Sequence, residues 1–267
     1  MSEAPRQPAE TKPAATILLL RDDPEFEVLM VKRHHQIDFA SGALVFPGGK
    51  THAGDHDPAW ADHCVGWDRF DSEQRALRIG AIREAYEEAG ILLAEGLDGS
   101  DFAEVCDPQV RSAVDRGETP FLDVVKDLGV RLRLDALTVF ARWITPTMMP
   151  KRFDTWFYAV RAPADQLAVA DGREAVDAEW ITPAEVLRLA DAGERTVIFP
   201  TRMNVQLLAE ATSASDCVAR AESRELVTVL PVVEKRGEAR FLVIPSNAGY
   251  GEVAEPMDRI AAESRAG

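Results

Sequence analysis

Residues 83–91, with the sequence Arg-Glu-Ala-Tyr-Glu-Glu-Ala-Gly-Ile, place three carboxylates within five positions of a predicted helix. Glu84, Glu87 and Glu88 are spaced so that all three project from one face, where like charges repel one another. They lie just before Gly90, a typical helix-ending residue, so the negative end of the helix dipole opposes them by roughly 0.3–1 kcal/mol per charge. Because this arrangement costs stability, it indicates a site for a hard divalent cation, Mg2+ or Mn2+, which prefers oxygen ligands.

A second motif upstream supports the metal-site interpretation. Residues 46–49, Phe-Pro-Gly-Gly, predict a turn, and Arg83 directly precedes the carboxylate run. An isolated run of this kind is more often a solvated helix face. The turn, the arginine and the terminal glycine occur here in one order, and that combination favours the metal site.

These residues resemble the signature of the Nudix hydrolases, GX5EX7REUXEEXGU, in which U is aliphatic. Gly49 supplies the opening glycine, and the second half is matched by Arg83, Glu84, Ala85, Glu87, Glu88, Gly90 and Ile91. Gly49 and Arg83 are 34 positions apart instead of 14, which indicates an insertion of about 20 residues. Counting forward from Gly49 places the first Glu of the signature at Asp55. Counting back from Arg83 places it at Arg75, with Glu73 the nearest glutamate, and the sequence leaves these alternatives open.

The resemblance implies an α/β/α sandwich with a mixed sheet that hydrolyses a diphosphate linkage with a metal. It implies that Mg2+ or Mn2+ is held by Glu84, Glu87 and Glu88 together with the backbone carbonyl of Gly48. Arg83 is expected to orient Glu87, although the alternative is an ordinary surface pair worth under about 0.5 kcal/mol.

A further catalytic carboxylate is expected on a later loop. Glu174 is the candidate, because Asp171-Gly172 marks a turn and Glu174 lies six residues before Trp180, as in many Nudix sequences. A plain exposed loop acid is an equally weighted alternative for Glu174.

The segment before the turn resembles the approach to the signature in CoA diphosphatases, LLTXRSXXXRXXXGXXXFPGG. The matching positions are Leu29, Arg33, Gly42 and residues 46–49, while Val31, His34 and Asp38 stand where that pattern has Thr, Ser and Arg. The long insertion inside the signature is similar to the branch that includes the peroxisomal CoA diphosphatases of animals. The resemblance therefore implies CoA or acyl-CoA as substrate, giving 4′-phosphopantetheine and adenosine 3′,5′-bisphosphate. Two alternatives stay open, a hydrolase of another nucleoside diphosphate derivative and a catalytically silent nucleotide-binding regulator.

Several basic residues are candidates for the outer phosphates of the substrate. These substrate-binding candidates are Lys32, Arg33 and Arg152, with Gly49 added by the resemblance, and the alternative for the three cations is solvated surface charge. His34 and His35 are adjacent on a strand and point to opposite faces, so we expect solvent exposure or local hydrogen bonds. The insertion, residues 51–71, carries His52, His56 and His63 without zinc spacing, so we expect it to be peripheral and to contribute no metal ligand.

Composition agrees with this class of protein. The 267 residues are 46% hydrophobic and carry a formal net charge of -15, which argues against a nucleic-acid binder and leaves a small phosphorylated substrate as the expected partner. No apolar run is long enough to span a membrane. Three widely spaced cysteines suggest a reducing, cytoplasmic location, and a homodimer is left open.

The chain is expected to form one elaborated Nudix domain over residues 15–192. A disordered tail is predicted for residues 1–14, insertions at about 51–71 and 95–131, and an extension packed on the same domain at 193–267. Ser72 is predicted to cap the carboxylate helix, and Thr182 a later one. Further helices are predicted at 108–116, 120–128 and 201–211, and strands at 15–20, 27–31, 43–46, 134–144, 155–160, 179–181, 226–233 and 240–244.

Overall fold

The computed structural model describes residues 8–33, 42–103 and 107–263. Within that part of the chain a mixed eight-stranded sheet has the order β10-β2-β1-β9-β8-β11, with β3 beside β2 and β4 beside β1. These strands are β1 (Thr11–Asp22), β2 (Phe26–Arg33), β3 (Leu44–Val45), β4 (Gly48–Lys50), β8 (Thr138–Ile144), β9 (Arg152–Arg161), β10 (Ala175–Ile181) and β11 (Thr228–Val229).

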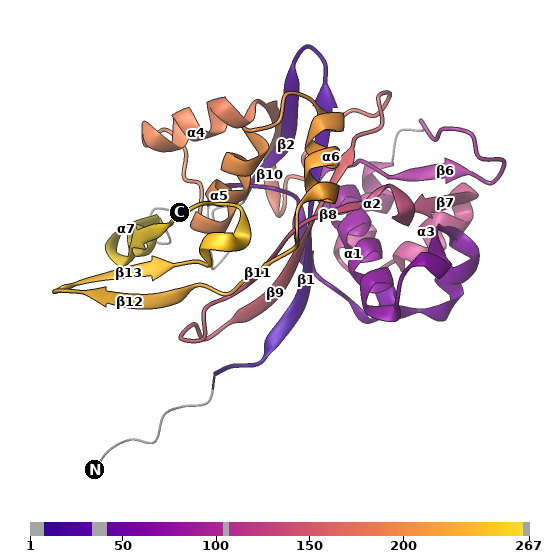
Figure 1. Ribbon diagram of the computed structural model, residues 1–267. Helices are drawn as coiled ribbons and strands as arrows, with labels where there is room; N and C mark the ends of the chain where they lie inside the picture. The colour runs from indigo at the N-terminus through magenta and orange to yellow at the C-terminus, as the bar shows by residue number, and fades with distance from the viewer. Residues whose placement is uncertain (1–7, 34–41, 104–106, 264–267) are drawn as a thin grey trace.

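Helices cover both faces of this sheet, which confirms the predicted α/β/α sandwich (Figure 1). Helix α1 (Ser72–Ala89) packs on one face, and α5 (Phe199–Leu208) and α6 (Ala214–Ser223) pack on the other. The sequence of the central strand β1 explains why both faces are covered, because its apolar side chains alternate between two hydrophobic cores, one on each face. Ala15, Ile17 and Leu19 pack in the core on the α1 side, and Leu18 and Leu20 pack in the core on the α5 side.

Strand β1 begins earlier than predicted. Residues 1–7 of the expected tail lie outside the described residues, but Thr11–Ala14 form part of β1, so the prediction of a disordered tail to residue 14 is wrong there. These residues pair in parallel with the start of β9, and the Pro13 carbonyl also accepts a hydrogen bond from Thr51 N at 3.2 Å. Local composition suggested disorder because it carries no information about the pairing of these residues with a strand 141 positions further along the chain.

Helix α1 is capped at both ends by side-chain and backbone chemistry. Asp71 is its N-cap and accepts a hydrogen bond from Gln74 N at 2.8 Å, so Ser72, the predicted cap, is the first helical residue instead. Both residues carry a capping oxygen, and sequence alone does not say which one leaves the helical conformation. Gly90 ends the helix with φ 70°, as predicted, a conformation that glycine adopts without strain.

The two insertions pack against α1 and against each other. The first contains η1 (Ala53–His56), η2 (Pro58–His63), β5 (Cys64–Val65) and η3 (Trp67–Arg69); the second contains β6 (Ala94–Gly96), α2 (Pro108–Asp115), α3 (Phe121–Leu128) and β7 (Val130–Arg133). Strands β5, β7 and β6 form a small sheet that joins them. Fully buried Trp60 lies 5.7 Å from Phe121, which lies 5.5 Å from Tyr86 of α1, between ring centroids. The first insertion is therefore not peripheral, because its aromatic anchor is part of the core beside the carboxylate helix.

Predicted elements after α1 are mostly confirmed, with altered bounds. Helices α2 and α3 match the predicted helices at 108–116 and 120–128, and Thr182 caps α4 (Pro183–Asp191) by accepting from Glu185 N at 3.2 Å. The segment predicted as one strand at 134–144 is instead η4 (Leu134–Ala136) followed by β8.

The C-terminal part of the chain is integral to the fold. Strand β11 extends the central sheet beside β8, and α5 and α6 supply its second helical layer. A further sheet contains β12 (Val232–Arg236), β13 (Ala239–Val243) and β14 (Ala254–Pro256). The short helix η5 (Ser246–Ala248) lies between β13 and β14, and α7 (Met257–Glu263) follows β14. Helix α6 was not predicted, and the run at 226–233 is divided between β11 and β12.

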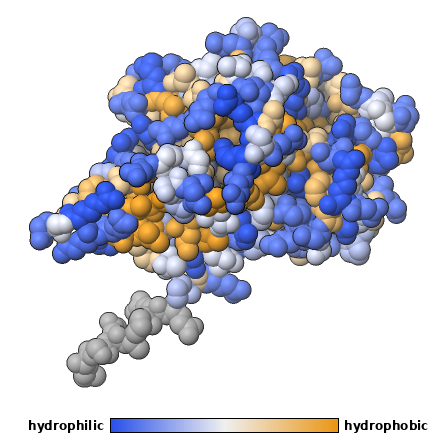
Figure 2. All heavy atoms as spheres, viewed as in Figure 1, coloured by the Kyte–Doolittle hydropathy of each residue, from blue (hydrophilic) through white to orange (hydrophobic). Residues whose placement is uncertain are grey.

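The surface agrees with the acidic composition. Hydrophilic residues cover most of the face shown in Figure 2, and apolar residues gather near the base of the β12–β13 hairpin. In the described part of the chain, no helix has the length and apolar character needed to cross a membrane.

Candidate active site

A buried arginine collects the carboxylates of the predicted metal site. Arg83 Nη1 donates to Glu84 Oε1 and to Glu87 Oε2, both at 2.9 Å. Its Nε and Nη2 donate to the two oxygens of Asp55 at 3.0 and 3.2 Å, and Nη2 also donates to the Lys50 carbonyl at 2.9 Å. A guanidinium has five N–H donors, and this geometry engages all of them. The predicted contact of Arg83 with Glu87 is confirmed, and it is buried rather than an ordinary surface pair.

Burial makes these charges interdependent. Loss of solvent raises the pKa of Glu84 to about 7 and that of Glu87 to about 8, although Arg83 opposes the rise in both. Burial alone would lower the pKa of Arg83, but Glu84, Asp55 and Glu87 outweigh that effect and raise it. The site therefore holds more negative charge than its one guanidinium neutralises.

The glycine turn closes on this helix as the signature implies. Gly48 N donates to Glu88 Oε2 at 3.1 Å, so the fourth buried carboxylate meets the turn whose carbonyl was predicted to bind metal. A Cβ atom at Gly49 would overlap the carboxylate of Glu84, and one at Gly48 would lie 2.7 Å from the Ala15 carbonyl oxygen. Both positions need glycine because the turn passes directly over α1 and β1.

Asp55 resolves the position that the sequence left open. It is 2% exposed and forms a bidentate pair with Arg83, whereas Glu73 is exposed at the first turn of α1. Arg75 lies over the Trp67 ring, 4.3 Å from its centroid, and donates to the Trp67 carbonyl. This burial and pairing agree with counting forward from Gly49, in which the extra residues follow Asp55 and the spacing from Gly49 to Asp55 is that of the signature.

The donor set suits a divalent cation in its chemistry. Glu84, Glu87 and Glu88 offer hard oxygen ligands, and a cation would relieve the excess negative charge around Arg83. Among the described residues, no group of three or more His, Cys, Asp or Glu side chains is arranged to hold a metal ion. Arg83 contacts only one oxygen of Glu84 and one of Glu87, so the second oxygen of each is not engaged by the guanidinium. The residues therefore fit a metal by type and burial.

Glu174 lies on the loop between β9 and β10, residues 162–174, close to the carboxylate helix. Its negative charge contributes to the raised pKa of Glu84, and α1 contacts β10, which begins at the next residue. Glu174 is half-buried, and its backbone N–H donates to Asp171 Oδ2 at 2.9 Å. The turn predicted at Asp171-Gly172 is confirmed by this bond and by a hydrogen bond of 2.8 Å from Gly172 N to the Ala175 carbonyl.

The basic residues predicted to bind substrate phosphates lie on β2 and at the start of β9. Arg152 donates from Nε and Nη1 to the backbone carbonyls of Thr145 and Ala9 at 3.0 and 2.8 Å, so these two donors tie the β8–β9 turn to the N-terminal segment. Lys32 is half-buried on β2, next to Arg33 at the end of that strand. Gly42 has φ 68°, which explains the glycine in the CoA-type approach. His34, His35 and Asp38 lie outside the described residues.

The histidines of the first insertion do not form a cluster with the carboxylates. His56 is exposed and His63 is half-buried, while His52 N donates to Asp55 Oδ2 at 2.8 Å. Burial and the positive charge of Arg83 lower the pKa of His52. His52 therefore supports Asp55 through its backbone, but the insertion as a whole is not remote from the site.

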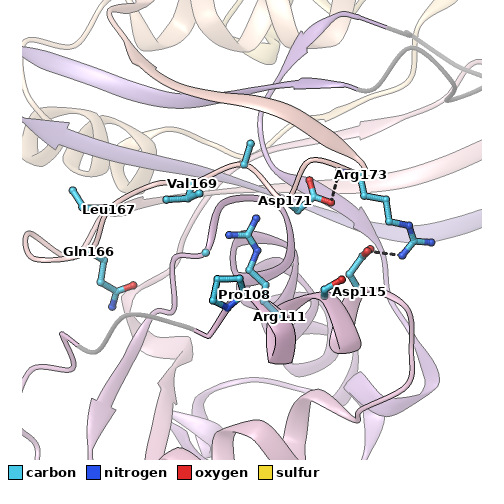
Figure 3. A pocket seen from close by; sticks show the side chains of 11 residues that line it. Pro108, Arg111, Asp115, Gln166, Leu167, Val169, Asp171 and Arg173 are labelled. Carbon is cyan, nitrogen blue, oxygen red and sulfur yellow. Dashed lines mark hydrogen bonds and ion pairs between the residues drawn. The ribbon is translucent and has the colours of Figure 1, made fainter.

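Three further residues near the carboxylate helix carry no sequence motif. Arg111 Nε donates to the Glu87 carbonyl at 3.0 Å, and Asp115 Oδ2 accepts from Arg173 Nη1 at 2.5 Å. Figure 3 shows them around a cavity of about 150 Å³ between α2 and the loop that bears Glu174. Sequence analysis missed them because their partners are 24 and 58 positions away.

Comparison with known proteins agrees with this geometry. A family described as the NUDT19 Nudix domain matches residues 68–206, more than half of the chain, and the chain belongs to this Nudix hydrolase family. The chain is similar to a crystal structure of a NUDIX hydrolase from Alicyclobacillus acidocaldarius, with 25% identity and a TM-score of 0.68 over 79% of this chain and 96% of that one.

Two curated relatives share a name. Acyl-coenzyme A diphosphatase NUDT19 of Homo sapiens is 26% identical over 282 residues, covering 88% of this chain and 75% of that protein. The protein of the same name in Xenopus laevis is 27% identical over 206 residues, covering 61% of this chain and 54% of that protein. The match to the frog protein thus spans about half of its length.

Proposed function

We propose that this protein is a divalent-metal-dependent hydrolase that cleaves the diphosphate of CoA or acyl-CoA, releasing 4′-phosphopantetheine and adenosine 3′,5′-bisphosphate. The buried network of Arg83 with Asp55, Glu84 and Glu87 carries the proposal, because it gathers several carboxylates at one place, where a bound cation would stabilise their ionised forms. The name shared by the frog and human relatives, and the CoA-type segment around Arg33 and Gly42, support the choice of substrate.

The carboxylates of α1 would hold the metal. Glu84, Glu87 and Glu88 are the proposed ligands, with the carbonyl of Gly48, and Mg2+ or Mn2+ is the proposed ion. When bound, the ion supplies charge neutralisation for the phosphoryl oxygens and lowers the pKa of a bound water. Arg83 has an orienting role, since its planar guanidinium fixes one oxygen of Glu84 and one of Glu87.

Glu174 is the proposed acceptor of the proton from the attacking water. Its placement near Glu84 supports this role, because a general base must lie close to the water that it activates. Lys32, Arg33 and Gly49 are the proposed contacts of the substrate phosphates. We also propose a cytoplasmic location, from the three widely spaced cysteines, of which Cys64 and Cys217 are free thiols.

A substrate panel tests the proposal. CoA, an acyl-CoA, ADP-ribose, a nucleotide sugar and a dinucleotide are assayed side by side with Mg2+ and with Mn2+, and products are identified by mass. CoA or its thioester is expected to show the highest kcat/KM, since the 3′-phosphate and pantetheine arm add contacts that strengthen in the transition state. A ranking with CoA last would replace CoA with another nucleoside diphosphate derivative, and no turnover of any substrate with either metal would contradict hydrolysis.

A further inference from the structure

Helix α2, from the second insertion, contacts both sides of the candidate active site. Arg111 binds the backbone of the carboxylate helix at Glu87, and Asp115 binds Arg173, the residue directly before Glu174. Arg111 and Asp115 are four residues apart, so they lie on one face of α2. We propose that this face positions the Glu174 loop against the carboxylate helix, with Asp115 and Arg173 as positioning residues. This inference rests on the proposed function and concerns the geometry of the same site.

The contact with α1 is made at the end of the helix. The Glu87 carbonyl lies in the last turn of α1, where carbonyls lack partners within the helix. The Arg111 guanidinium is 6% exposed and binds there, and its positive charge is favourable at the negative end of the helix dipole. A Cβ atom at Gly90 would lie 2.7 Å from Arg111 Nη1, so Gly90 leaves room for this side chain. Helix α2 is therefore fixed relative to Glu87.

The Glu174 loop is held by a small number of polar ties. The Asp171 carboxylate accepts the backbone N–H groups of Arg173, Glu174 and Ala175 at 3.1, 2.9 and 2.7 Å, which fixes the local turn. Val169 N donates to the Ala89 carbonyl at 2.9 Å, which ties an earlier part of the loop to the end of α1. Arg173 adds the tie next to Glu174, and Figure 3 shows its side chain extending to Asp115.

A cavity lies beside the ion pair of Arg173 with Asp115. About 150 Å³ of space lies between α2, Gly90 and the loop, so apolar packing does not set the height of the loop above α1 at this point. Leu167 and Val169 on the same loop are 81% and 58% exposed and do not anchor it. The Asp115 side chain is only 8% exposed, and Arg173 is 55% exposed. A half-shielded ion pair beside a cavity thus ties α2 to the segment that carries Glu174, in addition to the Asp171 turn, the Val169 backbone bond and the pairing of β10 with β2.

The test separates positioning from general stability. Arg173→Met and Asp115→Asn are made singly and together, with Arg173→Lys as the conservative variant. Arg188→Gln is the matched control, because it removes a helix ion pair of similar exposure, Arg188 Nε to Glu185 Oε2 at 2.8 Å on α4, whose charged neighbours are Glu185 and Glu194. For each protein, kcat, KM, melting temperature and hydrogen exchange of residues 166–175 are measured on the whole chain.

We expect kcat to fall about tenfold in both single variants while KM stays within about twofold, because a displaced Glu174 affects the chemical step more than binding. The double variant should be no worse than the worse single variant, since both remove one contact. Arg173→Lys should recover most of the activity, and Arg188→Gln should match the wild type. Exchange of residues 166–175 should increase only in the variants of the Asp115–Arg173 pair.

Three results would overturn the inference. They are wild-type kcat in both single variants, independent losses that multiply in the double variant, or an equal loss of kcat in Arg188→Gln. A wild-type protein that turns over no diphosphate substrate would instead defeat the proposed function. In that case hydrogen exchange still tests whether the Asp115–Arg173 pair holds the loop. Unchanged exchange of residues 166–175 in Arg173→Met would overturn the inference.

Discussion

The two faces of the central sheet are built from different chemistry. On the α1 side, Asp55, Arg83, Glu84, Glu87 and Glu88 are all buried beside an aromatic and aliphatic core. On the α5 side, the buried polar groups are neutral: Trp143 Nε1 donates to Tyr250 Oη at 3.0 Å, and Tyr250 Oη donates to Asn204 Oδ1 at 2.8 Å.

The difference separates what holds the fold from what performs chemistry. A neutral hydrogen-bonded chain is satisfied within the protein and stabilises one arrangement of α5 against the sheet. On the other side, the buried carboxylates of Asp55, Glu84 and Glu87 surround one guanidinium, which neutralises only part of their charge when all three are ionised. Loss of solvent raises the pKa of Glu84 and Glu87, and Arg83 opposes the rise. Substitutions on the α1 side should therefore remove activity and spare stability, and substitutions on the α5 side should do the reverse.

The largest effect is expected for Glu84→Gln and Glu88→Gln. Each removes a metal-directed charge from a buried site, so turnover should fall at least about a hundredfold, or about 2.7 kcal/mol of transition-state stabilisation. The fold should stay intact, because glutamine relieves charge repulsion at nearly the same volume. Steady-state kinetics at saturating metal and a melting curve of each variant are the measurements. Near-native turnover in both variants would contradict the assignment of chemistry to the α1 side of the sheet.

On the neutral face, Asn204→Ala should have the opposite result. Asn204 is fully buried, donates to the Pro200 carbonyl at 2.9 Å and accepts from Tyr250. Its loss leaves Tyr250 Oη without its acceptor, which should cost about 1–3 kcal/mol of unfolding free energy. Chemical denaturation measures this cost, and kcat per folded molecule should equal that of the wild type. A tenfold fall in kcat without loss of stability would show that the α5 side also takes part in chemistry.

The sequence was informative where interactions are local. The helix that carries Arg83 and the three glutamates, its terminal Gly90 and the glycine turn follow from short-range spacing, and the structure confirms them. Asp55 was left as one of three alternatives because its contact with Arg83 joins residues 28 positions apart across an insertion.

Other parts of the site had no sequence pattern at all. Arg111 and Asp115 sit in an ordinary short amphipathic helix, and only the packing of α2 against α1 and the loop brings them to the active site. Strand β1 was predicted too short for a related reason, since residues 11–14 become a strand only through pairing with β9 and β4.

A smaller effect should appear in the response of stability to pH and metal. Glu84 and Glu87 have pKa values raised from 4.5 to about 7 and about 8, so between about pH 4.5 and 8 the folded protein binds more protons than the unfolded chain. The unfolding free energy of the metal-free protein should therefore fall as pH rises through this window. The proposed metal ligands bind a cation in their ionised form, so the rise in melting temperature on adding Mg2+ or Mn2+ should be larger at pH 8 than at pH 5, by at least about 2 °C. Equal rises at both pH values would contradict the assignment of these two glutamates as ligands.

The smallest effect is expected for the joint replacement of His52, His56 and His63 by alanine. All three belong to the first insertion, yet the only contact of this group with the charged network described here is made by the His52 backbone, which alanine retains. The metal concentration for half-maximal activity should stay nearly unchanged, while KM is free to rise if the insertion contacts substrate.

Asp55→Asn is the contrasting variant from the same insertion. It removes the bidentate partner of Arg83 and leaves the guanidinium to compete with the metal for Glu84 and Glu87, so it should raise the metal requirement about tenfold. A metal requirement that rises tenfold in the triple histidine variant would place a metal ligand in the insertion. An unchanged requirement in Asp55→Asn would show that Asp55 fixes the fold of the insertion and not the charge balance of the site.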